Sequence, residues 1–434
     1  MKIRPPFQNM TSAKWQNLAI GSLITLYIIQ VILDLAWGNT FGNLGIDFGS
    51  FWSAGYVANH FGYANVYDLH LMEQVQIHLV PGTATEAFAF RVIPTPYLAI
   101  FIVPFQLLSL LPPRTAAWIW IALNFLALLL YLRYFISNTG GLHQNARLLA
   151  LVMVSAPVFL DLFTGQINVW LAICAGEALR AFMLGKSFRA GLWLGGLLLK
   201  PQVLIILVPA LLLQRAIRTL AGLATSGAAI IGVSFLLSGL QGFGQLARLW
   251  LGYAGGLPTN DIQLMMNWRM IGIQLGHLSR APTSLGIAIS GAVITFLAAM
   301  YLWMRPLRPE SPQFTIAFAG SLAATGAVAW HSHVHMAIMI LPALIYLHLS
   351  QAQSFHNKLE WWVFLPAGLY FVRIVLASSM HAGILPANIN DFIDLLNGIG
   401  LFALTLYLLG WAIKQTRSVG NGSLEPISVQ VIEV

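Results

Sequence analysis

The sequence predicts an all-α, polytopic membrane protein with about 10–12 membrane segments. Hydrophobic residues make up 58% of the 434 residues, charged residues make up only 8%, and the mean hydropathy is +0.76. So little charge cannot cover the surface of a water-soluble domain. Apolar runs long enough to cross about 30 Å of hydrocarbon follow one another along nearly the whole chain.

The first apolar run, from Leu18 to Trp37, predicts a retained membrane helix, because it is too long and too poor in small residues at its end for a cleaved signal peptide. Other predicted segments lie near 97–111, 115–136, 146–162, 167–184, 189–214, 219–240, 284–304, 313–330, 334–350, 360–378 and 392–413. They leave no room for a separate soluble domain, so residues 1–414 are predicted to form one membrane domain. Residues 415–434 are predicted to be a disordered cytoplasmic tail.

Basic residues give the expected orientation, since the cytoplasmic loops of membrane proteins are enriched in lysine and arginine. Their positions place both termini in the cytoplasm. Three long polar segments, at 38–91, 241–283 and 379–391, are then expected on the outer face of the cytoplasmic membrane. The net charge of +8 is scattered over helix ends and forms no stripe, which argues against a nucleic-acid-binding surface.

Two threadings of the chain after residue 92 remain open. Simple alternation of the segments would place the basic clusters at 133–147 and 180–189 outside, against the positive-inside rule. In the second threading, 92–136 crosses once and 189–214 is a hairpin broken at Lys200-Pro201. This threading places both basic clusters inside and fits the rule better.

The first outer segment begins with an aspartate followed by aromatic and small residues. Phe48, Phe51, Trp52 and Tyr56 recur at roughly helical spacing, which predicts a short helix in the interface with its aromatic face toward lipid. Asp47 stands at the start of this helix. Its carboxylate has two interpretations, a cap of the helix N-terminus or a general base at the membrane surface.

Several stretches, in a fixed order, carry a resemblance to a known family. They are Asp47-Phe48 followed by Asn65-Val66-Tyr67-Asp68, PTPYLAIFIVPFQLLSLLP from Pro94, Gly165-Gln166-Ile167-Asn168, AGLWLGGLLLKPQVLIILVPALLL from Ala190, and WHSHVHMAIMILPAL from Trp330. No single stretch is specific, and their order is the signal. Over residues 45–345 the chain resembles glycosyltransferase family 87, a family of C-type membrane glycosyltransferases that includes polyprenyl-phosphate-mannose-dependent mannosyltransferases.

The resemblance implies the C-type glycosyltransferase fold. It also implies transfer of a hexose, with mannose as the family default, from a polyprenyl-phosphate donor to a lipid-linked or glycan acceptor on the outer face. Asp47 matches the family's catalytic aspartate and is the expected general base. His333, and after it His331, are expected to stabilise the charge that develops on the leaving phosphate. No cofactor and no divalent metal are expected, and the expected partners are membrane lipids, the donor and the acceptor.

A lipid-phosphate donor requires cations near the membrane surface, and Arg91, Lys200 and Arg269 are the candidates. Lys200 interrupts an apolar segment, where a charge costs about 2.5–3.5 kcal/mol, so it needs a partner or a ligand. The alternative for Lys200 is a side chain that snorkels to the interface or bonds to carbonyls freed by Pro201. Arg91 is equally compatible with an interfacial anchor.

Polar and aromatic residues of the matching stretches are expected to bind the sugar or the acceptor. These residues are Gln166, Asn168, Tyr67, Asn267, Trp330 and His335. Gln166 and Asn168 are also compatible with amides that join membrane helices. Glu177 and Arg180, three residues apart on one segment, predict an internal ion pair.

The histidine-rich stretch has two readings that depend on its backbone. On a helix, His331 and His335 share a face at a metal-ligand spacing, whereas in an extended turn all three histidines can face one side. No HExxH motif or acidic cluster is present, and Cys174 is the single cysteine. A metal site is therefore not predicted.

Two other classes of function stay open. A transporter or lipid flippase would also suit about twelve helices, but it predicts inverted repeats, and no convincing internal symmetry is present. A non-catalytic assembly protein or a polysaccharide polymerase would concentrate arginines in its large outer loop, where only Arg248, Arg269 and Arg280 occur. An aspartate directly after the first helix favours the transferase.

Overall fold

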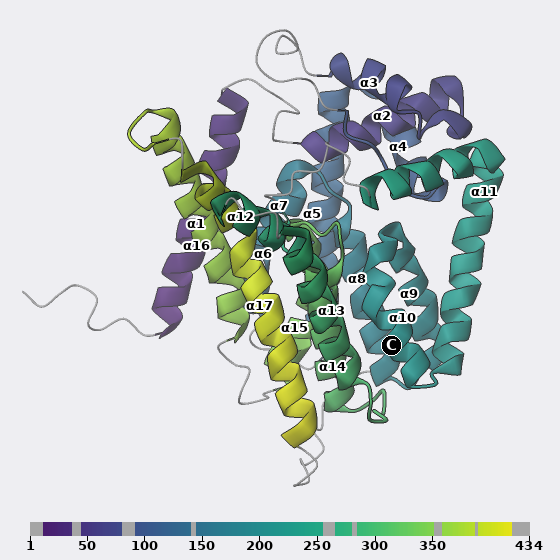
Figure 1. Cartoon of the computed structure of the whole chain (residues 1–434), viewed down its shortest axis with the longest axis vertical. Helices are drawn as coiled ribbons and strands as arrows, with labels where there is room; N and C mark the ends of the chain where they lie inside the picture. The colour runs from purple at the N-terminus through teal and green to yellow at the C-terminus, as the bar shows by residue number, and fades with distance from the viewer. Residues whose placement is uncertain are drawn as a thin grey trace, which may run out of the picture.

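The computed structural model describes residues 12–36, 45–79, 92–139, 145–254, 265–279, 284–350, 358–386 and 389–418. Most of these residues are helical, and the strand-like pairing among them is an isolated antiparallel bridge between Met265 and His333. Figure 1 shows long helices running side by side, with shorter helices gathered at the upper end of the molecule. The predicted all-α architecture is confirmed.

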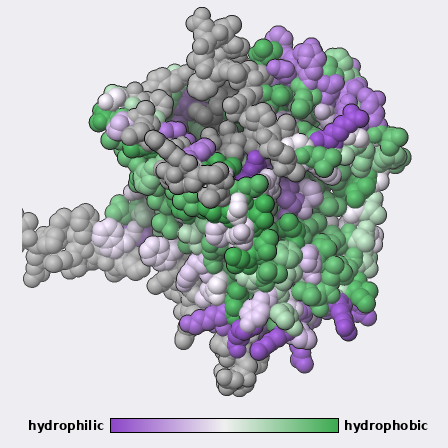
Figure 2. All heavy atoms as spheres, viewed as in Figure 1, coloured by the Kyte–Doolittle hydropathy of each residue, from purple (hydrophilic) through white to green (hydrophobic). Residues whose placement is uncertain are grey.

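Six of the described helices are long and apolar enough to cross a membrane. They are α1 (Ser12–Ala36), α5 (Pro113–Asn138), α11 (Ile217–Ala254), α13 (Ser284–Leu302), α16 (Lys358–His381) and α17 (Asn390–Ser418). A seventh span is formed if α6 (Asn145–Met153) and α7 (Ala156–Thr164), which meet at 59°, are taken together. Figure 2 shows a broad band of hydrophobic residues between more hydrophilic upper and lower ends, as a membrane-spanning molecule requires.

Several predicted segments consist of helices that are shorter than a full crossing. The helices that belong to these segments are η2 (Ala99–Ile102), α4 (Val103–Leu108), α8 (Asn168–Met183), α9 (Ser187–Gly195), η3 (Gly196–Leu199), η4 (Pro201–Val203), α10 (Leu204–Leu213), α14 (Pro312–Val328), η6 (Val334–Ile340) and α15 (Leu341–Leu349). The predicted interruption at Lys200-Pro201 is confirmed, since η3 ends at Leu199 and η4 begins at Pro201. The 189–214 segment is therefore two half-length arms joined at Lys200.

Contacts between turns agree with the second threading. At the lower end, Gln214 Nε2 donates to the carbonyls of Trp303, at 2.6 Å, and Arg305, at 2.8 Å. Arg180 of α8 lies over the Tyr134 ring of α5, with its guanidinium carbon 5.4 Å from the ring centroid. Phe182, near the end of α8, lies 4.7 Å from Phe314 and Trp303 lies 5.2 Å from the same ring, measured between ring centroids. Both basic clusters therefore lie at the end of the bundle that holds the turns at Gln214 and Arg305, as the second threading requires.

The described part of the segment that was expected to be the first outer one, residues 45–79, contains three helices, α2 (Ile46–Phe61), η1 (Tyr63–Asn65) and α3 (Leu69–Ile77). The predicted helix after Asp47 is confirmed, but its predicted orientation is wrong. Phe48 is 0% and Phe51 2% exposed, and the Phe51 ring lies 4.9 Å from the Phe105 ring of α4. The aromatic face therefore packs on the protein, because helical spacing marks an apolar face without saying whether lipid or protein covers it.

The second outer segment is also more helical than expected. Gly239, at φ 63°, bends α11, and the helix continues to Ala254 across residues that were expected to be a loop. Trp250 in this second half donates its indole N–H to the Pro96 carbonyl at 2.9 Å. A further helix, α12 (Trp268–Ser279), precedes α13, and Figure 1 shows the second half of α11 lying across the upper end.

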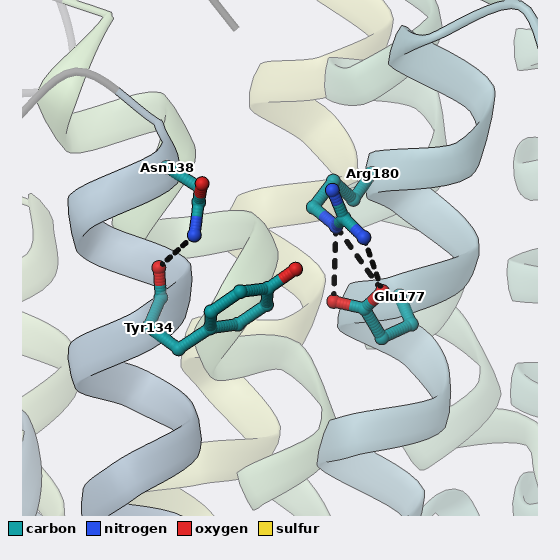
Figure 3. Close-up of polar contacts among 4 residues, drawn as sticks. All are labelled: Tyr134, Asn138, Glu177 and Arg180. Carbon is teal, nitrogen blue, oxygen red and sulfur yellow. Dashed lines mark hydrogen bonds and ion pairs between the residues drawn. The ribbon is translucent and has the colours of Figure 1, made fainter. Parts of the chain in front are cut away.

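The predicted ion pair inside α8 is confirmed. Arg180 Nη2 lies 3.1 Å from Glu177 Oε2, and Arg180 Nε donates to both carboxylate oxygens of Glu177. Figure 3 shows the two side chains facing each other, with Tyr134 of α5 extending toward them. Both side chains are more than nine-tenths buried, so the pair joins α5 and α8 inside the bundle.

Candidate functional site

The N-terminus of α2 is held against the turn between α7 and α8. Gly45 is the N-cap residue of α2, and its amide donates to the Phe163 carbonyl at 2.7 Å. Asp47 lies in the first turn of α2 and is partly buried. Its charge therefore meets the positive end of the helix dipole, although the N-cap position itself belongs to glycine.

Gly165 makes this contact possible. Its φ is +72°, a left-handed conformation that closes α7, and a Cβ built on it would lie 2.6 Å from the Cβ of Phe48. Trp120 of α5 donates its indole N–H to the Gly165 carbonyl at 3.0 Å. A glycine at this position thus allows α2, and Asp47 with it, to approach the α7–α8 turn.

Replacing Gly165 by alanine is expected to destabilise this contact and to lower activity by displacing the start of α2. Gly383, at φ +73° with no heavy atom within 4 Å of a built Cβ, is the matched control. Both variants carry the cost of a left-handed alanine, about 1–2 kcal/mol, and only Gly165→Ala adds a clash of about 1–3 kcal/mol. Thermal unfolding in detergent measures the difference, and equal losses would contradict the role assigned to Phe48.

Lys200 lies at the junction of the two half-length arms. Its side chain is 6% exposed, and its Nζ donates to Gln166 Oε1 at 3.2 Å. The ammonium also lies 6.0 Å from the centroid of the Tyr97 ring. The structure thus provides the partner that a lysine at this depth needs, and the alternative of a snorkelling lysine is wrong.

A second carboxylate, Asp161, lies beside Lys200 and was not identified from the sequence. It is fully buried, and its Oδ1 accepts hydrogen bonds from Asn168 Nδ2 at 2.6 Å and from the Asn168 amide at 3.3 Å. The charges of Asp161 and Asp47 both act on Lys200. Hydrogen bonds and charge interactions therefore join α2, the α7–α8 turn and the Lys200 junction in one polar cluster, which consists of Asp47, Asp161, Gln166, Asn168 and Lys200.

The histidine stretch follows α14 as an extended turn. His333 has φ −88° and ψ 159°, and η6 begins only at Val334, so the helical reading with a metal-ligand spacing is wrong. The ring centroids of His331 and His333 are 4.6 Å apart, and those of His333 and His335 are 5.3 Å apart. No group of three or more His, Cys, Asp or Glu residues within the described ranges is arranged to hold a metal ion.

One hydrogen bond and the charges of two cations link the histidine turn to the Lys200 cluster. Gln202 Nε2 donates to the His331 carbonyl at 3.3 Å. Burial, assisted by the charges of Lys200 and Arg269, lowers the pKa of His331 to about 3. His331, which lies in the turn outside the membrane-spanning helices, is therefore neutral at pH 7 and acts as a hydrogen-bonding group without charge.

Arg269 and Asn267 approach the same turn from the start of α12. Asn267 Nδ2 donates to the Ala329 carbonyl at 2.8 Å and its Oδ1 accepts from the Met270 amide, so Asn267 caps α12 and joins it to the turn. The guanidinium carbon of Arg269 lies 5.3 Å from the Trp330 ring centroid. Arg269 is 7% exposed, and its Nη1 has no hydrogen-bond partner among the described residues.

The remaining predicted site residues fall into three cases. Tyr67 is buried and donates its hydroxyl to the Tyr97 carbonyl at 2.7 Å, which ties the first outer segment to the ring beside Lys200. His335 is buried, and its Nε2 has no hydrogen-bond partner among the described residues. Arg91 lies outside the described residues. Apart from Arg91, the structure thus brings the predicted site residues to the end of the bundle where Asp47 and Lys200 lie.

Comparison with known proteins gives one match. The model of glycosyltransferase family 87 matches residues 95–330, whereas neither the curated proteins nor the solved structures provide a significant match. The matched range includes the α7–α8 turn, Lys200 and the start of α12, and it covers more than half of the 434 residues. The suspected family is confirmed. With this match, and with six membrane-length apolar helices among the described residues, the chain belongs to glycosyltransferase family 87 and is a membrane glycosyltransferase.

Proposed function

We propose that this protein transfers a hexose, with mannose as the first candidate, from a polyprenyl-phosphate donor to a lipid-linked or glycan acceptor on the outer face of the cytoplasmic membrane. One observation carries the proposal. Asp47, Lys200, Arg269 and the histidine turn, which are far apart in the sequence, are linked by contacts or charge interactions at one end of the bundle. A base and two cations are what transfer from a phosphate-linked sugar requires.

Asp47 is assigned as the general base. In the proposed reaction it accepts the proton of the acceptor hydroxyl while that oxygen forms the new bond to the anomeric carbon. The bond between the anomeric carbon and the phosphate oxygen breaks, and the lipid phosphate leaves with the electron pair. A phosphate is a good leaving group, so the site has to stabilise developing negative charge more than it has to supply a strong acid.

Lys200 and Arg269 are assigned to the phosphate. An ammonium has three N–H donors, and Gln166 takes one of those of Lys200. Arg269 lies over the Trp330 ring, with its guanidinium carbon 5.3 Å from the ring centroid, and keeps an N–H group without a partner among the described residues. Both cations act on His331, so the two positive charges converge on the histidine turn. His331 there, as a neutral imidazole, can donate a hydrogen bond to the same phosphate or to the sugar.

Transfer assays on membranes test the proposal. Membranes that contain the protein, and matched membranes that lack it, are supplied with radiolabelled polyprenyl-phosphate mannose, glucose or galactose and with a lipid extract as acceptor. Label is expected to move into a new glycolipid or glycan with one of these donors and not with the corresponding nucleotide sugar. Transfer from the nucleotide sugar alone, or passage of the unaltered labelled lipid across the membrane without transfer, would overturn the proposal.

Replacing Arg269 by glutamine is expected to raise the KM for the donor about 10- to 100-fold, because a hydrogen bond to a charged group contributes about 1.5–3 kcal/mol. Arg248 on α11 is exposed, and Arg248→Gln is the matched control, which is expected to leave the KM near that of the wild type. Initial rates over a donor series measure both values. An unchanged donor KM in Arg269→Gln would remove this residue from the phosphate site.

A further inference from the structure

Asp161 is the one fully buried carboxylate of the described residues that the proposed reaction does not use. It lies in the last turns of α7, where the helix dipole is unfavourable for a negative charge. Its main-chain carbonyl also accepts from the Gln166 amide at 2.8 Å, so the residue forms part of the turn that presents Gln166 to Lys200. A charge in this position is costly unless a cation compensates it.

The two oxygens of the Asp161 carboxylate have different surroundings. Oδ1 is fixed by two hydrogen bonds from Asn168. Oδ2 has no hydrogen-bond partner among the described residues, although it is buried. Gln166 links this residue to Lys200, because its amide donates to the Asp161 carbonyl at 2.8 Å and its Oε1 accepts from Lys200 Nζ at 3.2 Å. The charge of Lys200 also acts on the Asp161 carboxylate. The α7–α8 turn therefore connects the Asp161 carboxylate, which Asn168 holds, to the Lys200 ammonium, which Gln166 holds.

Asp161 and Asp47 differ in exposure to solvent, and this difference assigns them different roles in the reaction. Asp47 is partly buried at the start of α2, whereas Asp161 is 0% exposed. A carboxylate that no solvent reaches cannot take a proton from an acceptor hydroxyl that enters from outside without a rearrangement of the turn. Its influence has to pass through a neighbour, and Lys200 is that neighbour.

We infer that Asp161 is a positioning residue for the transfer reaction: its carboxylate, fixed by Asn168, holds the α7–α8 turn whose Gln166 keeps the Lys200 ammonium in place at the junction of the two half-length arms, where Lys200 binds the phosphate of the donor. The inference rests on the proposed function. It places Asp161 one step away from the substrate, with Lys200 between them. Loss of Asp161 should therefore weaken donor binding through Lys200 and should do little once Lys200 is absent.

A double-mutant cycle tests this coupling. The variants are Asp161→Asn, Lys200→Met and the double variant, each purified in detergent and assayed with the radiolabelled donor. Asp161→Asn is expected to raise the donor KM about 10- to 100-fold while kcat at saturating donor and the acceptor KM change by less than about 3-fold. The double variant is expected to have the donor KM of Lys200→Met alone. Losses that multiply in the double variant, or a fall in kcat without a change in donor KM, would overturn the inference.

Thermal unfolding of the same variants gives a second readout. Lys200→Met leaves a buried carboxylate without its cation and is expected to lower the Tm, and adding Asp161→Asn is expected to recover part of that loss. Asp161→Glu, which keeps the charge, is the conservative variant and is expected to retain more donor affinity than Asp161→Asn. Equal donor KM values for Asp161→Glu and Asp161→Asn would overturn the inference.

Failure of the inference and failure of the proposed function give different results. If the wild-type protein transfers no sugar from any polyprenyl-phosphate donor, the proposed function is wrong, and the positioning role is wrong with it. If the wild-type protein transfers sugar and the effects of the two substitutions are independent, only the positioning role is wrong.

Discussion

Replacing Asp47 by asparagine is expected to reduce the rate of sugar transfer about 10²- to 10⁴-fold, the range that general bases contribute. Asparagine keeps the size of the side chain and its ability to accept a hydrogen bond, but it cannot take the proton of the acceptor hydroxyl. The first turn of α2 tolerates the substitution, because Gly45 and not Asp47 is the N-cap residue. Single-turnover transfer with a saturating polyprenyl-phosphate donor measures the chemical step directly.

Asp68 offers a matched control in the same outer segment. Its Oδ1 accepts from the amides of His70, at 2.9 Å, and Leu71, at 3.2 Å, so it is the N-cap of α3. Asparagine caps helices as well as aspartate does, and Asp68→Asn is therefore expected to keep wild-type transfer and stability. If Asp47→Asn protein, inserted and folded like the control, transferred sugar at the wild-type rate, another group would have to be the base.

The helices could be predicted from the sequence because long apolar runs indicate membrane helices and a proline indicates where a helix is interrupted. Each predicted apolar segment contains helix, and the break at Lys200 was visible as a charge followed by proline inside an apolar run. Hydropathy windows could not separate full crossings from half-length helices, since both are uniformly apolar. Thus the sequence offered α9 and α10 as two short arms only in the second threading, and the structure decided between the two threadings.

The association of Gln166, Lys200 and the histidine turn followed from the family resemblance and not from spacing. The residues come from separate helices, and no local pattern predicts the hydrogen bond from Lys200 to Gln166. Burial of the aromatic face of α2 could likewise not be predicted from the sequence, because an apolar face with helical spacing can contact either lipid or protein. The extended backbone at His333 settled the histidine reading, which the sequence had left between a helix and a turn.

Asp161 was missed because a hydropathy profile averages over many residues. Its neighbours in the run VFLDLFTG are apolar, so the average over a window hides one carboxylate. A signal was nevertheless present, because an ionisable residue inside an apolar segment is costly and commonly functional. The same reasoning led to Lys200 and would have led to its carboxylate neighbour.

The ion pair inside α8 carries the largest expected effect on stability. Replacing Glu177 by glutamine is expected to cost about 3–5 kcal/mol, because the Arg180 guanidinium would remain buried without its counter-charge. The pair is held by three contacts of 3.1–3.2 Å and is covered by Tyr134 of α5. Thermal unfolding in detergent is expected to show a large fall in Tm, with the remaining active fraction falling in parallel.

Two further variants separate the loss of the counter-charge from other causes. Glu310→Gln replaces an exposed glutamate of the lower end and is expected to change stability by less than about 0.5 kcal/mol. The double variant Glu177→Gln with Arg180→Met removes both charges and is expected to regain most of the lost stability, because the pair's desolvation cost disappears with it. If the double variant were no more stable than Glu177→Gln, the loss would come from packing between α5 and α8, and the ion pair would not be its cause.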